Sequence, residues 1–164
     1  MKQPPFKILH FAFSISFILA LQGVAGAPFT SNGDGTVTDQ KSKLIWQRCS
    51  MGYNSDAVCS DDGTAANNTA NWADALAYCN TLSLAGRSWR LPSINELKSI
   101  VDETRSNPTI DTVAFPATAP ESYWSSTTYA VATNTAWVVW FEYVYAGNLN
   151  KALYKLHVRC VSAP

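Results

Sequence analysis

The sequence predicts an α+β domain in which two helices pack on small antiparallel sheets and disulfides link the elements. Apolar residues recur at helical spacing over residues 71–82 and 94–102. The last third of the chain is rich in β-branched and aromatic residues, which favour strands. Four cysteines follow an N-terminal segment that has the properties of an export signal, so they are expected in an oxidising compartment.

Residues 1–27 are expected to be a cleaved signal peptide. Lys2 and Lys7 form a short basic region, residues 8–21 are almost wholly apolar, and Ala25-Gly26-Ala27 has the small-x-small pattern of a cleavage site. A transmembrane anchor is the alternative, but the apolar run is short for a bilayer span of about 20 residues. We therefore expect residues 28–164 to form one exported domain that is periplasmic, secreted or held at the cell surface, and not embedded in the membrane.

The charge of the exported part argues against binding to nucleic acid. Loss of the two N-terminal lysines leaves 10 basic against 12 acidic residues, a formal charge of −2. All six tryptophans lie in this part, so one hydrophobic core has ample material.

Four cysteines leave three pairings open. We favour Cys49 with Cys59, which closes a small polar loop, and Cys79 with Cys160, which ties a helix to the last strand. A zinc site is the alternative, but the exported part has no C-x-x-C pair and a single histidine, His157.

The first half of the exported part is expected to begin with a hairpin. Strands at residues 35–39 and 44–47 follow the turn Asn32-Gly33-Asp34-Gly35. Residues 49–68 have the composition of a loop. A helix then starts near Asn71, places Cys79 on its apolar face, and ends before Gly86.

The segment Trp89-Arg90-Leu91-Pro92-Ser93-Ile94-Asn95-Glu96-Leu97 predicts the start of a second helix. Pro92 ends a short extended piece over residues 88–91. Ser93 and Glu96 have the spacing of a capping box, in which each side chain accepts the other residue's backbone N–H. Glu96 is therefore interpreted as a structural cap rather than as a general base, and the helix is expected over residues 94–102.

The last third is expected to form three strands, at residues 123–127, 136–145 and 151–161, with a turn at Gly147-Asn148. Lys151, Lys155 and Arg159 then fall on one face of the last strand, over about 13 Å. Such a basic row suits an acidic or sulfated polysaccharide. The alternative is a solvated edge strand protected by its charges.

Four aromatic residues are candidates for ligand binding: Tyr129, Trp140, Tyr143 and Tyr145. Together they supply more aromatic surface than one small core requires. Aromatic rings stack on sugars and also anchor protein interfaces, so the pattern predicts a ligand or a partner without deciding which. The alternative is that most of these rings belong to the core.

The sequence also contains candidates for a metal site and for a catalytic site. Asn32, Asp34 and Asp39 are weak candidates for a structural calcium ion, but the same residues are typical of a hairpin turn, and no glutamate completes an EF-hand loop. No other cofactor is predicted.

A Ser-His-Asp hydrolase would have to use His157, and no G-x-S-x-G motif is present. We therefore do not expect an enzyme.

Seven segments in order resemble the Lcl C-terminal domain family, which occurs at the end of a bacterial collagen-like adhesin and in many exported bacterial proteins. Together they span the exported part nearly end to end. They are Asn32-Gly33-Asp34-Gly35-Thr36-Val37-Thr38-Asp39, Leu44-Ile45-Trp46-Gln47-Arg48-Cys49, Trp72-Ala73-Asp74-Ala75-Leu76-Ala77-Tyr78-Cys79, the segment from Trp89 to Leu97, Ala114-Phe115-Pro116, Tyr123-Trp124-Ser125-Ser126-Thr127 and Val158-Arg159-Cys160-Val161.

The resemblance implies a C-type lectin-like fold, because the family is similar to those folds. In them a cysteine near the end of the first helix pairs with one on the last strand, which supports the pairing of Cys79 with Cys160. The sugar-binding calcium motifs of true C-type lectins are absent. The related formylglycine-generating enzymes share the Arg-Leu-Pro segment, but their late pair of redox cysteines is missing here.

The resemblance also bears on function, because the adhesin of the family is associated with sulfated glycosaminoglycans. The first expectation is thus a non-enzymatic, adhesin-like module that recognises an acidic or sulfated polysaccharide. The second is a protein-interaction module of the cell envelope or of a surface fibre, which would use the aromatic strand as its interface. The two differ in salt sensitivity, because only a polyanion interaction is strongly screened by salt.

Overall fold

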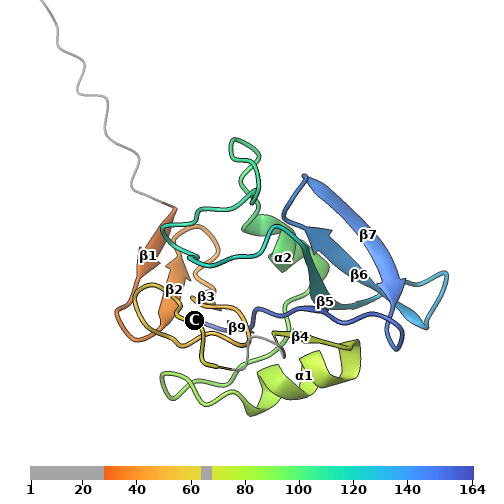
Figure 1. Ribbon diagram of the computed structural model, residues 1–164, viewed down its shortest axis with the longest axis horizontal. Helices are drawn as coiled ribbons and strands as arrows, with labels where there is room; N and C mark the ends of the chain where they lie inside the picture. Colours follow the sequence, from red (N-terminus) through yellow and green to blue (C-terminus); the bar gives the residue numbers. More distant parts are fainter. Residues whose placement is uncertain (1–27, 64–67) are drawn as a thin grey trace, which may run out of the picture.

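The computed structural model describes residues 28–63 and 68–164, so the expected signal peptide at residues 1–27 lies outside the described residues. Two helices and two sheets make up this part of the chain (Figure 1). The elements are β1 (Phe29–Ser31), β2 (Thr36–Asp39), β3 (Ile45–Gln47), β4 (Thr69–Ala70), α1 (Trp72–Thr81), α2 (Ile94–Ser99), β5 (Ser122–Thr128), β6 (Thr135–Trp140), β7 (Tyr145–Asn150), β8 (Leu156–His157) and β9 (Val161–Ser162). None of the described helices is long and apolar enough to cross a membrane.

The four-stranded sheet has the order β1-β2-β3-β9 and is antiparallel throughout. Its centre is the hairpin of β2 and β3, as predicted from residues 35–39 and 44–47. Gly35 has a φ of 84° at the end of the turn before β2, and a Cβ there would lie 2.7 Å from the Cβ of Ser55. Glycine is thus required both by the backbone conformation and by the close approach of the disulfide-bonded loop.

The five-stranded sheet has the order β4-β8-β5-β6-β7, with one parallel pair, β5 and β8. The predicted strand at residues 136–145 ends at Trp140, and residues 141–144 form the turn. The turn predicted at Gly147-Asn148 is wrong, because both residues lie inside β7. A Cβ at Gly147 would lie 2.9 Å from the Trp140 ring, so this glycine marks a close ring approach within a strand.

The predicted strand at residues 151–161 is also wrong. The chain forms only β8 and β9 there, and these belong to different sheets. The Asn150 side chain accepts hydrogen bonds from the backbone N–H groups of Ala152 and Leu153, which starts a turn directly after β7. The C-terminal segment thereby joins the two sheets rather than extending one of them.

Both helices begin where the sequence predicts. Asn71 caps α1 by accepting from the Asp74 N–H, and Ser93 and Glu96 form a complete capping box on α2. The second helix is shorter than the predicted range of residues 94–102, because the backbone leaves the helical conformation at Ile100.

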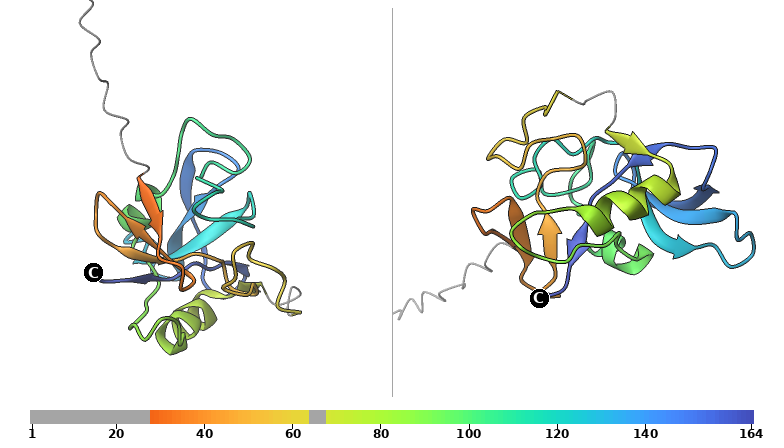
Figure 2. Two further views of the ribbon diagram at one scale, coloured as in Figure 1. Left: turned by 90° about the vertical axis from the view of Figure 1, so that its left-hand side faces the viewer. Right: turned by 90° about the horizontal axis from the view of Figure 1, so that it is seen from below.

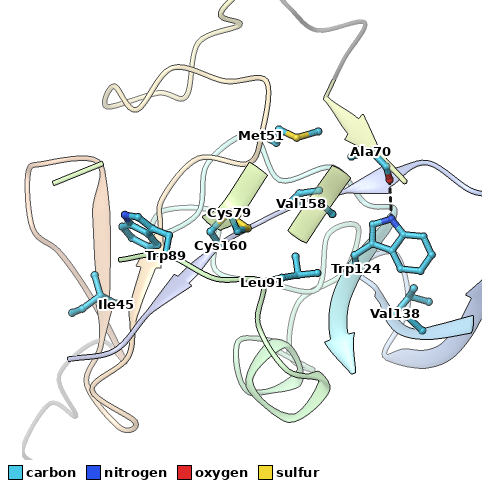
Figure 3. Close-up of a cluster of buried hydrophobic side chains, with 12 residues drawn as sticks. Ile45, Met51, Ala70, Cys79, Trp89, Leu91, Trp124, Val138, Val158 and Cys160 are labelled. Atoms are coloured by element: carbon cyan, nitrogen blue, oxygen red, sulfur yellow. Dashed lines mark hydrogen bonds between the residues drawn. A yellow bond between two sulfur atoms is a disulfide. The ribbon is translucent and has the colours of Figure 1, made fainter. Parts of the chain in front are cut away.

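Two disulfides confirm the favoured pairing, Cys49 with Cys59 and Cys79 with Cys160. The second joins α1 to the segment between β8 and β9, at the middle of one of two buried hydrophobic clusters (Figure 3). In this cluster the Trp124 indole N–H donates to the Ala70 carbonyl over 2.8 Å. The second cluster lies against α2 and includes Trp46, Phe115, Tyr123 and Phe141.

The hairpin of β6 and β7 lies on the opposite side of the molecule from β1 and β2, with α1 below (Figures 1 and 2). Both faces of β6 carry large side chains, as the sequence predicts, since Val138 belongs to one cluster and Val139 to the other. The hairpin is therefore held on both sides while its free edge and its turn reach solvent.

Candidate functional site

The hairpin of β6 and β7 separates its aromatic side chains onto two faces. Tyr129 and Trp137 form an edge-to-face pair with ring centroids 5.2 Å apart. Trp140 and Tyr145 are cross-strand partners, and their rings lie 5.2 Å apart. Trp137 and Trp140 have opposite parity on β6, so these pairs lie on opposite faces of the sheet.

A pocket of 390 Å³, which we call the Trp137 pocket, lies on the Trp137 face, between the hairpin and the C-terminal end of α2. The two elements are adjacent because Leu97 and Ile100 of the α2 segment pack in the same buried cluster as Val139. The lining combines apolar and charged residues: Lys98, Val101, Glu103, Trp137, Val139, Val144, Tyr145 and Ala146.

The chemistry of this pocket suits an amphipathic ligand. Trp137 is half-buried and supplies an indole surface, with Val101 and Val139 as further apolar lining. Lys98 and Glu103 are exposed, and neither side chain bonds to another group in the described part of the chain. One cation and one anion are therefore available to polar groups of a bound molecule, beside a ring on which an apolar face can stack.

The structure places the four predicted aromatic residues in different settings. Tyr129 supports Trp137 from its edge, while Trp140 stacks over Gly147 on the far face. Tyr143 and Tyr145 are 62% and 61% exposed at the hairpin turn. Tyr145 lies at the edge between the two faces, since it lines the pocket while its ring packs against Trp140. Tyr143 does not line the pocket, and the Tyr143 hydroxyl donates to Glu142 over 2.8 Å.

The predicted basic row does not exist. Lys151 follows β7, where its ammonium donates to Thr128 and Thr133 and lies 4.0 Å from the Trp72 ring centroid. Lys155 is exposed in the loop before β8. Arg159 is 1% exposed and points into the protein interior. The three residues fail to align because residues 151–161 do not form one strand.

Arg159 instead occupies a buried polar cluster. Its guanidinium donates to the carbonyl groups of Gln47 and Arg48 and to the hydroxyl groups of Ser50 and Thr118. It also lies 4.7 Å from the Phe115 ring centroid. Burial lowers the pKa of Arg159. The cluster joins β3, the loop after it and the segment before β5, so its role is to hold the fold.

His157 is also buried, which bears on the catalytic alternative. Its ring stacks on Tyr123 at 5.2 Å, and Nε2 lies 3.3 Å from a Glu121 carboxylate oxygen. Burial lowers the pKa of His157, and the Glu121 carboxylate partly offsets this effect. His157 is 4% exposed and does not line the pocket on the Trp137 face.

The weak calcium candidates are not brought together. Asn32 and Asp34 lie in the turn before β2, where their side chains bond to Thr36 and Thr38. Asp39 lies at the other end of β2 and accepts from Lys41 and Ser42. The described residues contain no group of three or more histidine, cysteine, aspartate or glutamate side chains placed to hold a metal ion.

Glu96 serves the capping role predicted for it. Its carboxylate accepts from the Ser93 N–H and forms a two-pronged salt bridge with Arg90. The Arg90 guanidinium is the main reason that the pKa of Glu96 falls from 4.5 to about 2, with further hydrogen bonds from Ser93. With so low a pKa, and with both oxygens already accepting hydrogen bonds, this carboxylate is a weak base near neutral pH.

The sequence reasoning missed Trp137, Lys98 and Glu103 as candidate site residues. Parity along β6 did place Trp137 opposite Trp140, but no pattern showed which face would remain open. Lys98 and Glu103 carry no motif, and only the packing of α2 against the hairpin brings them to Trp137.

Among known proteins, the chain is similar to one family of domains. Neither the curated proteins nor the solved structures gave a match to the chain. Residues 35–162 match the family described as the Lcl C-terminal domain, which covers most of the chain and includes α2, the hairpin of β6 and β7 and both disulfides. The chain belongs to the Lcl C-terminal domain family.

Proposed function

We propose that this protein is a non-enzymatic, exported binding module that holds a carbohydrate chain in the Trp137 pocket, in an adhesin-like role. The observation that carries the proposal is the half-buried Trp137 in the lining of this pocket, which also includes Lys98 and Glu103. Sugar rings present an apolar face that stacks on indole and hydroxyl groups that bond to charged side chains. Both requirements meet in this pocket.

The charge around the pocket favours an uncharged glycan over a sulfated one. Lys98 and Glu103 are the charged residues of the lining, and their opposite charges balance each other. The row of Lys151, Lys155 and Arg159 that suited a polyanion is absent, since Arg159 is buried. We therefore infer a neutral or weakly charged polysaccharide as ligand, bound with little dependence on salt.

Export is supported by both disulfides, which persist in an oxidising compartment. We infer that residues 1–27 are the signal peptide and that the mature domain is periplasmic, secreted or surface-held. A relationship to C-type lectin-like folds is supported by the bridge from α1 to the segment before β9, and it remains part of the proposal. The burial of His157 supports a binding role rather than a catalytic one.

A panel of defined oligosaccharides tests the proposal. The purified protein is titrated by calorimetry with cellohexaose, maltohexaose, chitohexaose and a heparin-derived hexasaccharide, in low and in physiological salt. We expect binding to at least one neutral oligosaccharide, with an affinity that salt hardly changes. Salt-sensitive binding to the heparin fragment alone would contradict the neutral-ligand proposal, and no binding at all would direct the search to protein partners.

Two tryptophans on the same strand provide a matched comparison. Trp137→Leu should weaken binding at least about fivefold, because loss of ring stacking removes about 1 kcal/mol. Trp137→Phe, which keeps a ring, should retain most of the affinity. Trp140→Leu removes the same side chain from the opposite face and should leave the affinity unchanged, with near-ultraviolet circular dichroism confirming that each variant is folded. Equal losses from Trp137→Leu and Trp140→Leu would contradict the assigned site.

A further inference from the structure

The strand β7 is an open edge of the five-stranded sheet, since the order β4-β8-β5-β6-β7 gives it one neighbour. The Lys151 N–H donates to the Asn134 carbonyl, directly beyond the paired residues Asn150 and Thr135. Backbone groups alternate in direction along an antiparallel strand. The backbone groups of Gly147 and Leu149 therefore face β6, and those of Ala146, Asn148 and Asn150 face away from the sheet.

The usual protections of an edge strand are missing from β7. Natural edge strands carry lysine or proline, contain a bulge, or are covered by another element. The strand Tyr145–Asn150 has no charged residue and no proline, and its register with β6 is regular over all six pairs. In Figure 1 this strand lies at the outer margin of the molecule, and no other described element pairs with its free side.

Both ends of this edge carry exposed apolar side chains. At the hairpin turn Tyr143, Val144 and Tyr145 are 62%, 53% and 61% exposed. After the other end, Leu153 and Tyr154 are 79% and 47% exposed. These five are most of the large exposed hydrophobic residues in the described part of the chain, which contains eight. Such a concentration around one strand indicates an interaction surface.

We propose that two copies of this chain pair through β7, antiparallel and about a two-fold axis at Asn148. In this register Asn148 lies opposite its own copy, and Ala146 lies opposite Asn150. The outward backbone groups of both strands then form about six hydrogen bonds. A two-fold axis makes such an interface self-complementary, which is the commonest arrangement of homodimers.

The antiparallel arrangement also matches the ends of the two strands. It brings the turn of one copy, with Tyr143 and Val144, against the loop of the other, with Leu153 and Tyr154. Glu142 in the turn and Lys155 after the loop have opposite charges, so each end of the interface gains an attractive pair. The apolar residues and the opposite charges at the two ends of β7 therefore fit a second copy of this chain better than an unrelated strand.

The dimer has a consequence for binding that goes beyond the proposed carbohydrate site. A two-fold axis normal to a continuous sheet places the same face of both copies on the same side. The two Trp137 pockets would then open side by side, so that one polymer chain could contact both. Dimer formation itself does not depend on any ligand and is tested without one.

Sedimentation velocity of the full chain, expressed with its own N-terminal segment and purified in the form that export yields, tests the interface. The range from about 1 to about 300 µM is needed, because an edge interface is at the small end of interface sizes. We expect the mass to double within this range. Asn148→Lys and Asn148→Asp should each remain monomeric, because like charges would meet at the axis.

The decisive sample is a one-to-one mixture of the two variants. Opposite charges then face each other, so the mixture should regain the doubled mass that neither variant shows alone. Asn80→Lys on the exposed side of α1 adds the same charge elsewhere and should dimerise like the unchanged protein. A monomer at every concentration would overturn the proposal, and so would an oligomer that persists in Asn148→Lys or a mixture that stays monomeric.

Discussion

Arg159 is one of the largest fully buried side chains of the domain, and the described carboxylates form no salt bridge with it. Carbonyl and hydroxyl oxygens from two separate segments surround its charge instead. Removal of the guanidinium would take a donor from all four acceptors, of which the Ser50 and Thr118 hydroxyls keep bonds to Tyr123 and Phe115. Each buried group left unsatisfied costs about 1 to 3 kcal/mol. A single side chain therefore ties β3 and the loop after it to the segment before β5.

We predict that Arg159→Met lowers the free energy of unfolding by about 3 kcal/mol or more, measured by urea denaturation. Arg159→Lys should also destabilise the protein, because an ammonium cannot reproduce the planar fork of donors. Arg87→Met removes an exposed guanidinium and should change stability by less than about 0.5 kcal/mol. Similar effects of the buried and the exposed substitution would contradict this account of the cluster.

Glu96 provides a pH-dependent test at the start of α2. Its pKa is about 2 in the folded protein against an ordinary 4.5, mainly because of the Arg90 guanidinium. The unfolded chain thus takes up this proton first as the pH falls. The stabilisation is fully present above about pH 4.5 and is lost between that pH and about pH 2.

We predict that Glu96→Gln lowers the free energy of unfolding by about 1 to 2 kcal/mol at neutral pH, a figure reduced because Arg90 is half-exposed. The difference from the unchanged protein should shrink as the pH falls below about 4.5. Glu103→Gln, an exposed carboxylate just beyond α2, serves as the control and should show no such trend. A difference that stays constant down to pH 2 would contradict the salt bridge as its source.

Among the elements, the two disulfides differ in what they hold together. The bridge of Cys79 and Cys160 spans 81 residues and joins α1 to the C-terminal segment, while that of Cys49 and Cys59 spans 10 residues of one loop. In the chain-entropy model the longer loop contributes about 4.5 kcal/mol and the shorter about 2.7 kcal/mol. Both bridges are buried, so they do not differ in exposure to solvent. The model attributes the difference in stabilisation to loop length alone.

We predict that changing both Cys79 and Cys160 to serine lowers the thermal midpoint more than changing both Cys49 and Cys59. The losses in free energy of unfolding should differ by about 2 kcal/mol. Differential scanning calorimetry of both double variants provides the measurement. No residue of the shorter loop lines the Trp137 pocket, so loss of Cys49 and Cys59 should leave ligand binding intact. An equal or opposite order of stability would show that local packing outweighs loop closure.

The elements that the sequence predicts well are those with local signals. Asn71 and Ser93 mark the two helix starts, and the structure confirms both starts and the capping box predicted at Ser93. Gly147 misleads because a glycine serves turns and close packing alike, and only the Trp140 ring distinguishes the two uses. The segment 151–161 alternates like one strand, yet a turn at Asn150 and the burial of Arg159 divide it between two sheets.

For the molecule as a whole, the candidate site was only partly within reach of the sequence. The aromatic composition of residues 129–145 indicates a binding surface near the correct strands. The choice of face depends on which side α2 covers, and this is a long-range contact that no local pattern encodes. The same holds for the open edge at β7, because strand order is a property of the complete sheet.

A nuclear magnetic resonance titration with these oligosaccharides, which follows the six tryptophan indole N–H signals, tests whether the Trp137 pocket is a carbohydrate site. The claim predicts that a neutral oligosaccharide shifts the Trp137 signal first and most, while buried Trp46 and Trp124 stay in place. A largest shift at Trp140 would place the ligand on the opposite face. That result, or no shift of any indole signal at saturating oligosaccharide, would contradict the assignment of the Trp137 pocket as a carbohydrate site.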